Sequence, residues 1–478
     1  MTQETLAPQS EGRRIVIAFI VAFAFIMQGS DTTVLTIAIP TIAASLGVSP
    51  LMLHLAVTGY LVSLAVFMPV SGWFADRFGM RRVLCASLIV FSGSSILCAL
   101  SPNLEWLVAA RILQGFGGAM MTPVGRLIVL RAFGPGRTLD AMTYLTMPVI
   151  VGPLIGPLLG ATIISVASWR WIFVINIPIC LLVVTLLQIF VPKDRPLQVQ
   201  HRFDFKGFFM AGAALVLFQL GVEHMSYPLA GPTGTIALFA GSMLMLVIYY
   251  RHAQNTVRPA LELSLFGIRA FAVGVVGGGI GRIGLNSTTF LLPLLLQLGL
   301  GMNPIEAAAY SSTAALGAFA AKAFLRRSVA RFGFGNVVAV LAVAGALLMA
   351  CFALTETSTP IVLLVTCVIM LGAIRSMYFN AVNGLTYSEV PDAMLSRSVS
   401  SAGVFQQLSM GLGVSAAAAV LGLLTQPGAT PDLPEFTEAF LIMSVVPLLS
   451  IPFMLSLARS AAKSIEETAD VSPPVVSK

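Results

Sequence analysis

Apolar stretches of membrane-spanning length recur along the whole 478-residue chain, and they constrain its fold more than any other feature. A spanning helix needs about 20 apolar residues. Only helices or closed barrels satisfy their backbone hydrogen bonds in lipid, and these stretches lack the alternation of barrel strands. Charged residues make up only 10% of the chain, against about 25% in soluble domains. We therefore predict an all-α polytopic membrane protein.

One helix on each apolar stretch predicts fourteen transmembrane helices. Their expected ranges are 15–46, 51–71, 83–101, 104–130, 141–166, 171–191, 207–222, 233–250, 270–299, 305–325, 335–354, 360–386, 397–425 and 437–457. We group the chain into an N-terminal six-helix bundle (1–191), two linking helices with cytoplasmic loops (192–269), a C-terminal six-helix bundle (270–457) and a cytoplasmic tail (458–478).

The basic residues predict how these helices are oriented. Of the 27 Lys and Arg residues, most lie in the termini or in the loops that follow even-numbered helices, and Arg170 is the exception on the other side. Glu223 is among the acids that we place in the opposite loops. Since cytoplasmic loops are rich in Lys and Arg, we expect both termini in the cytoplasm.

Asp31 is the only acid that we place inside any of the long apolar stretches. A charge at bilayer depth costs about 2.5–3.5 kcal/mol, so such a residue is a functional candidate. Arg111, Gln114, Gly115 and Gly118 have the spacing of one helix face. Because a buried arginine needs an anion or several carbonyls, we hypothesise that Arg111 lies close enough to Asp31 to bias its protonation. The alternative is that Arg111 binds carbonyls near the membrane interface.

The segment 72–83, GWFADRFGMRRV, predicts a short cytoplasmic gate loop with glycines for tight geometry, an acid for a helix terminus and arginines for the inner face. A plain basic loop would explain the arginines but not the spacing of the glycines and the acid. The residues concerned are Gly72, Asp76, Arg77, Gly79, Arg81 and Arg82. The sequence ADRFG at 75–79 recurs loosely as VARFG at 329–333, which favours two parallel halves. Ala330 replaces the acid there, so a symmetric second gate is not expected.

Gly152, Gly156 and Gly160 form a stripe of small residues that lets helices approach closely. Pro153 and Pro157 interrupt the hydrogen bonds of the same helix and make it bent or pliable. We expect either ordinary tight packing or a sealed, kinked contact between the two halves that limits proton leak.

Three cations, Arg282, Lys322 and Arg375, lie deep in the second half without an acid. They either contact water, carbonyls and amides or attract anionic or zwitterionic substrates. Lys322 could equally reach the cytoplasmic edge. The residues that we expect to line a cavity or bind substrate are Gln28, Gln114, Arg282, Asn286, Lys322, Arg375, Asn383 and Gln407.

The segment 72–83 resembles the signature between helices 2 and 3 of the major facilitator superfamily. With fourteen spans and four further motifs, the chain resembles the drug:proton antiporter family of EmrB/QacA type, nearest its MdtD-like subgroup. Asp31 to Pro40 resembles the helix 1 motif of that family, with Thr36 where Asn is usual. The other matching motifs are RILQGFGGA (111–119), GPLIGPLLG (152–160, followed by Ala161 where a second Gly is usual) and WRWIFVINIP (169–178).

This resemblance implies a major facilitator fold and a proton-coupled exporter of amphipathic small molecules or drugs that works by alternating access. Asp31 and Arg111 would be its proton-coupling residues, and it would use the proton gradient without a cofactor. We expect small-molecule substrate, protons and membrane lipid as partners and no nucleic acid, with the chain in the inner membrane of a bacterium. An accessory periplasmic or outer-membrane partner is left open and is not indicated by the sequence. The alternatives are export of a specific metabolite or organic anion, or a membrane sensor or scaffold without transport.

Enzymatic activity and a metal site are not expected. The chain has no phosphate-binding GxxxxGK[ST] motif and no room for a soluble catalytic domain. The five cysteines have no paired spacing. The four histidines are scattered among the ends and loops of the predicted helices: His54, His201, His224 and His252.

Overall fold

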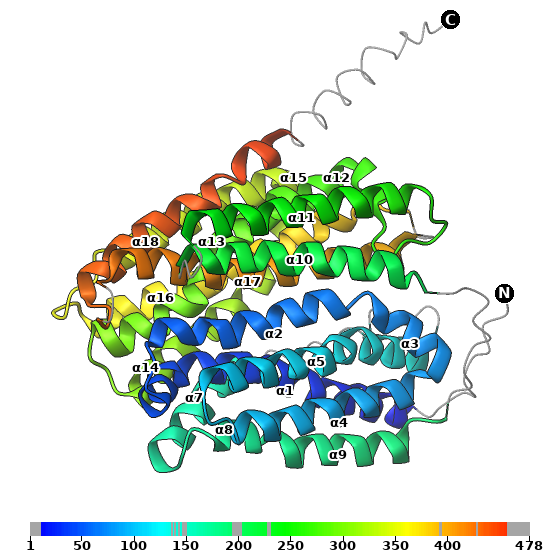
Figure 1. Cartoon of the computed structure of the whole chain (residues 1–478), viewed down its shortest axis with the longest axis horizontal. Coiled ribbons are helices and arrows are strands. Elements are labelled where there is room, and N and C mark those ends of the chain that lie inside the picture. Colours follow the sequence, from blue (N-terminus) through cyan, green and yellow to red (C-terminus); the bar gives the residue numbers. More distant parts are fainter. Residues whose placement is uncertain are drawn as a thin grey trace, which may run out of the picture.

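The protein is a stack of long helices that run along one common direction (Figure 1). The computed structural model describes residues 11–456 apart from 135–136, 138–139, 142–143, 146–150, 194–202, 227–230, 392–393 and 427–428. Every regular element in these described ranges is helical. The prediction of an all-α chain is therefore confirmed.

The N-terminal helices occupy the lower part of Figure 1 and the C-terminal helices the upper part. The N-terminal elements are α1 (Glu11–Leu46), η1 (Pro50–Leu53), α2 (His54–Phe67), α3 (Val70–Phe78), α4 (Met80–Ala99), α5 (Leu104–Phe133), α7 (Val151–Val166), α8 (Trp171–Val174) and α9 (Asn176–Phe190). Two helices follow, α10 (Phe205–Ser226) and α11 (Gly231–Gln254). The C-terminal elements are η2 (Leu263–Gly267), α12 (Arg269–Ala272), η3 (Val273–Gly277), α13 (Gly278–Leu294), η4 (Leu295–Gly299), α14 (Pro304–Ser312), α15 (Ala314–Phe352), α16 (Ile361–Tyr387), α17 (Leu395–Leu424) and α18 (Leu433–Leu448).

Within the described residues, 11 helical segments are long and apolar enough to cross a membrane. Three of the predicted helices are not among them. The range 104–130 corresponds to α5, the range 141–166 to α7 and a preceding part that is only partly described, and the range 305–325 to α14 with the first part of α15. The structure thus has helices at all of the predicted positions.

We call the end of the stack at which α1 begins the near side and the opposite end the far side. α14 and α18 begin on the far side, and each begins with a capping box. Asn303 and Glu306 exchange hydrogen bonds with each other's backbone N–H groups, and Asp432 and Glu435 do the same. These polar residues satisfy the first N–H groups of both helices at the end of an apolar span.

The segment 72–83 is a helix and a sharp turn, so the predicted loop is wrong. α3 continues to Phe78, and α4 begins at Met80. The chain reverses at Gly79, whose φ of 88° favours glycine. Gly333 has a φ of 75° inside α15 and separates its two helical segments. The sequence echo of 75–79 at 329–333 therefore marks two turns of the same kind.

Helices from the two ends of the chain meet along two lines. α7 packs against α14, and α2 packs against α17. α10 lies alongside α2, α11 and α17, as Figure 1 shows for α2 and α11. α10 therefore contacts both the N-terminal and the C-terminal helices. α11 is mostly exposed, with Ser242 and Tyr249 as its buried residues.

Candidate functional site

Asp31 lies in the middle of α1 and is 6% exposed. Its carboxylate forms an ion pair with Arg111 of α5. The other carboxylate oxygen, Oδ1, accepts hydrogen bonds from Gln114 Nε2 and from Asn176 Nδ2 of α9, each 3.1 Å long. Three donors from two helices thus surround one buried acid. We call these four residues the carboxylate cluster.

Arg111 is fully buried. Besides Asp31, it donates from Nη1 to Gln114 Oε1 over 2.6 Å and from Nε to the Ala56 carbonyl over 3.2 Å. Its guanidinium carbon lies 4.3 Å from the centre of the Tyr60 ring, at the distance of a cation–π contact. Among the residues that the structure describes, Arg111 Nη2 has no hydrogen-bond partner. The expected proximity of Arg111 to Asp31 is therefore present, and the carbonyl contact is secondary.

Two polar residues of this site were not predicted. Ser95 Oγ on α4 accepts from Gln114 Nε2 over 2.8 Å and from Asn176 Nδ2 over 3.4 Å. Asn176 belongs to the WRWIFVINIP motif, so the motif could have pointed to it. Ser95 has no comparable signal in the sequence, because an isolated serine in an apolar helix usually bonds to its own backbone, as Ser95 also does with the Phe91 carbonyl.

Glycines of α5 bring the helices close enough for these contacts. A Cβ atom at Gly115 would lie 2.6 Å from the Tyr60 carbonyl oxygen of α2. Gln28, a predicted cavity residue, donates to the Gly118 carbonyl over 3.2 Å and accepts from Thr122 Oγ1 over 3.0 Å. Gln28 therefore joins α1 to α5 beside the carboxylate cluster.

The glycine stripe of α7 packs against α1, so of the two alternatives its described contacts fit tight packing between helices of the same half. Cβ atoms at Gly156 and Gly160 would lie 2.7 Å from Thr33 Oγ1 and 2.8 Å from Val34 Cγ1. Gly152 accepts a hydrogen bond from Ser30 Oγ over 3.3 Å. The stripe thus lets α7 approach α1 on both sides of Asp31. Pro157 lies inside α7, and the side chain of Pro153 lies outside the described residues.

A different part of α7 meets the C-terminal helices. Ala161 is buried in one cluster with Ile37 of α1 and Ala308 of α14. This part of the contact between the two groups of helices is therefore made by alanine and isoleucine near the far side.

The predicted C-terminal cations meet neutral groups. Arg282 Nη2 donates to Asn383 Oδ1 over 2.6 Å, and its Nε has no hydrogen-bond partner in the described part of the chain. Arg375 Nη1 donates to Thr289 Oγ1 over 2.8 Å. Asn286 donates to the Met410 carbonyl over 3.0 Å. Neither arginine has an acid partner within the described residues, as expected.

The structure gives less information about two further residues that were predicted to line a cavity. Gln407 is half-buried on α17. The side chain of Lys322 lies outside the described residues, so the choice between a substrate contact and the membrane edge stays a prediction for it.

A second buried ion pair was missed. Glu223 lies inside α10 and is 8% exposed, and it pairs with the fully buried His54 of α2. The prediction that Glu223 lies in a loop is therefore wrong, whereas His54 begins α2, as expected for a histidine at a helix end, and has an acid partner that was not predicted. α10 continues past the predicted end at residue 222 to Ser226, because apolar composition locates helix ends only to within a few residues. His252 also has an acid neighbour, Asp204, at 2.7 Å.

The residues of the predicted gate lie at the near side. Arg77 is exposed with its guanidinium 5.7 Å from the centre of the Trp73 ring. Arg81 donates to the Val191 carbonyl over 2.9 Å, which joins α4 to the end of α9. Burial raises the pKa of Asp76, and the charge of Arg131 opposes this shift. Gly72 lies within α3 and has open space around it.

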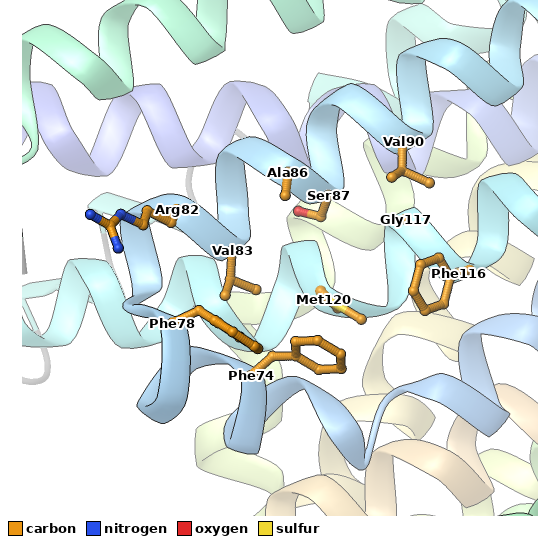
Figure 2. A pocket seen from close by; sticks show the side chains of 10 residues that line it. All are labelled: Phe74, Phe78, Arg82, Val83, Ala86, Ser87, Val90, Phe116, Gly117 and Met120. Carbon is orange, nitrogen blue, oxygen red and sulfur yellow. The ribbon is translucent and has the colours of Figure 1, made fainter. Parts of the chain in front are cut away.

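A pocket of about 320 Å³ lies between α3, α4 and α5 beside this segment (Figure 2). Its lining is almost entirely apolar. Arg82 stands at one end with its guanidinium pointing away from the rings of Phe74 and Phe78 (Figure 2). None of the predicted cavity residues lines it. The pocket is therefore separate from the carboxylate cluster.

Comparison with known proteins agrees with this architecture. Residues 21–414 match the model of the Major Facilitator Superfamily. The chain belongs to the major facilitator superfamily. Members of this superfamily are transporters, and the predicted fold class is confirmed.

Curated relatives cover almost the whole chain. A putative multidrug resistance protein MdtD from Pectobacterium atrosepticum is 36% identical over 439 residues, which are 91% of this chain and 94% of that protein. The MdtD protein of Cronobacter sakazakii is 38% identical over 404 residues, 84% of this chain and 85% of its own length. The expected likeness to MdtD-like proteins is confirmed, and the protein is a multi-pass bacterial membrane transporter.

Solved structures of the superfamily share the fold. The peptide transporter POT in complex with sulfate superposes with a TM-score of 0.69 at 14% identity, over 95% of this chain and 97% of its own. The D-xylose-proton symporter gives a TM-score of 0.66 at 15% identity, over 92% and 96% of the two chains. At such identities the likeness describes the fold alone.

Proposed function

We propose that this transporter is a proton-coupled antiporter that exports amphipathic small molecules or drugs across the cytoplasmic membrane. The observation that carries the proposal is the buried ion pair between Asp31 and Arg111. An acid inside a membrane span that is paired with a base is the usual arrangement of a proton relay. The multidrug resistance proteins among its relatives support the substrate class.

Protonation of Asp31 would remove the counter-ion of a fully buried arginine. Losing one partner of a buried ion pair costs about 3–5 kcal/mol, and Arg111 Nη2 already lacks a partner among the described residues. A proton on Asp31 therefore requires a rearrangement that gives Arg111 water or another acceptor. This requirement links the protonation state to the conformation.

The rearrangement would reach five helices. Asp31 lies on α1, Arg111 and Gln114 on α5, Asn176 on α9, and Ser95 on α4, while the Ala56 carbonyl of α2 accepts from Arg111. A change at the carboxylate cluster would thus change contacts of most N-terminal helices. In alternating access, proton and substrate would each favour a different opening.

The proposal also includes the orientation of the chain in the membrane and a gate formed by the segment 72–83. Both termini lie in the cytoplasm, so the near side faces inward. The six residues of the predicted gate, from Gly72 to Arg82, lie at this side and would close it. The division into two six-helix bundles joined by α10 and α11 would let the bundles rock against each other.

The decisive experiment uses purified protein in proteoliposomes with ethidium, a lipophilic cation, as the probe. A proton gradient should drive ethidium transport by the wild type, and ethidium should release protons from the purified protein. Asp31→Asn should abolish both effects. Asp140→Asn, a change at a surface acid paired with Arg137, is the control. Proton-driven transport by Asp31→Asn at the wild-type rate would refute the proposal.

A second candidate is the export of a specific metabolite or organic anion. The observation that favours it is that, within the described ranges, Arg282 and Arg375 have only neutral partners and Arg282 Nε has none. Salicylate, an aromatic carboxylate, is a suitable probe. Under this candidate, Arg282→Gln would lower salicylate transport and leave ethidium transport unchanged.

A further inference from the structure

Glu223 joins helices from the two ends of the chain. Its Oε1 accepts hydrogen bonds from Ser415 Oγ of α17 over 2.6 Å and from Gln219 Nε2 over 2.8 Å. Its Oε2 faces His54 Nε2 of α2. Gln219 Nε2 also donates to Ser415 Oγ over 2.5 Å. One buried carboxylate on the helix between the two groups thus connects α2 to α17.

The contact between His54 and Glu223 requires a bound proton. His54 Nδ1 faces the Leu51 carbonyl, which can only accept, so Nδ1 carries a hydrogen. Nε2 faces a carboxylate oxygen, so a second hydrogen must lie between these two atoms. Without this hydrogen, two lone pairs would face each other inside the protein. The pair can therefore remain in contact only while it holds that proton.

We propose that His54 and Glu223 form a second proton-binding site, whose proton holds α2 against α10 and α17 and whose loss lets them separate on the far side. This inference rests on the proposed antiport. In such a cycle, a proton that binds from outside would close the far side, and its release would allow that side to open again.

The surroundings contain few other ionisable groups. Each member of the pair is the only charged neighbour that acts on the other within the described residues. The next residue, His224, faces Thr235 of α11 at 2.9 Å. α13 contributes the Phe290 ring, whose centre is 6.3 Å from that of His54, and α17 contributes the hydroxyl of Ser415. The proton shared by His54 and Glu223 is thus the charge that determines whether these two residues stay in contact.

Cross-linking between α2 and α17 can test the inference. A Cβ atom at Gly411 would lie 3.7 Å from the Leu61 Cβ, within the usual range for a disulfide of about 3.5–4.5 Å. The pair Leu61→Cys and Gly411→Cys is introduced into the full-length wild type and into Glu223→Gln, Glu223→Ala and Glu438→Gln. Glu438 is an exposed acid on the same side. Oxidation rates are measured in membranes at about pH 6 and about pH 9, a range that includes histidine titration.

The two variants at position 223 have opposite expected effects. A Gln amide can bond to His54 without a titrating proton, so Glu223→Gln should cross-link rapidly at both pH values. Glu223→Ala should cross-link about tenfold more slowly than Glu223→Gln at both, since it loses the side-chain hydrogen bonds to His54 and Ser415 that an amide can keep. The wild type should match Glu223→Gln at the lower pH and approach Glu223→Ala at the higher pH. Glu438→Gln should follow the wild type.

Comparing variants at the same pH removes the effect of pH on thiol chemistry. An unchanged ratio of wild type to Glu223→Gln at the two pH values would overturn the inference, as would equal rates for Glu223→Ala and Glu223→Gln. The assay needs no transported substrate. A failed ethidium experiment with Asp31→Asn would therefore refute the antiport alone, and a failed cross-linking experiment would refute the second site alone.

Discussion

Arg111 on α5 and Asp31 on α1 are ion-paired inside the N-terminal helices, with 0% and 2% of their side chains exposed. The pair is held from several directions, because Gln114 donates to Asp31 and accepts from Arg111. In this geometry each of the two buried charges is stabilised by the other. This dependence makes the pair testable by stability as well as by transport.

Arg111→Ala should lower the free energy of unfolding by about 3–5 kcal/mol, because it leaves a buried carboxylate without its partner. The double variant Asp31→Asn/Arg111→Gln should lose less than the sum of the single changes, since neither charge is left alone. Thermal unfolding in detergent measures both. Arg137→Ala, which removes an exposed pair with Glu11, should cost about 0–1 kcal/mol. Equal losses for Arg111→Ala and Arg137→Ala would contradict the prediction.

Gly156→Ala should destabilise the protein by about 1–3 kcal/mol through overpacking. Its new methyl group would lie 2.7 Å from Thr33 Oγ1 and 3.3 Å from the Ser30 Cα, so α7 has to move away from α1 next to Asp31. Gly93→Ala on α4 is the matched control, because it has no atom within 4 Å of the added carbon. The melting temperature should fall for Gly156→Ala alone, and transport should fall with it.

Gly79→Ala and Gly72→Ala should change the stability of the folded protein in opposite directions, although both glycines belong to the same motif. Gly79 has a φ of 88°, where a side chain costs about 1–3 kcal/mol. Gly72 lies in helical α3 with open space around it, so alanine should be neutral or stabilise by up to about 1 kcal/mol. Denaturation midpoints of the two variants check this. A loss at Gly72 equal to that at Gly79 would indicate a role for Gly72 outside the helix geometry.

Asp76→Asn should become more stable than the wild type as the pH rises. Because burial raises the pKa of Asp76 in the folded protein, the folded state binds this proton more tightly than the unfolded state does. The wild type therefore loses stability as the pH rises from the ordinary aspartate pKa through the raised one. Melting temperatures measured across this acidic range test the sign. Glu438→Gln, which changes an exposed acid, is the control. If the difference in melting temperature between Asp76→Asn and the wild type did not change with pH, the titration of Asp76 would be excluded as its cause.

The turn glycines and the pairing of Asp31 were within reach of the sequence. ADRFG and its echo VARFG lie where Gly79 and Gly333 reverse the chain. The helical spacing of its motif placed Arg111 inside a membrane span, where it needs an anion. Asp31 was the acid assigned to the N-terminal spans, so it was predicted as the partner. Asn176 and Ser95 were not predicted, because the rotation of α9 and α4 about their axes depends on how neighbouring side chains pack.

Other contacts between distant segments were left open or missed. The glycine stripe of α7 meets α1 instead of the C-terminal helices, and a stripe of small residues does not specify its partner helix. Glu223 was assigned to a loop because an acid at the end of an apolar stretch has the same composition as a loop acid. Its partner His54 is 169 residues away, and only the packing of α10 against α2 brings them together.

Hydropathy, charge bias and local motifs by themselves determined that this chain is an α-helical transporter of the major facilitator type with one acid-bearing helix near its start. These properties follow from the lipid bilayer, in which the backbone must satisfy its own hydrogen bonds, and from residues that are close in sequence. The tertiary structure decided which buried charges meet. A charge inside a membrane span is stabilised only by a specific partner at hydrogen-bond distance, and that distance is set by how helices pack.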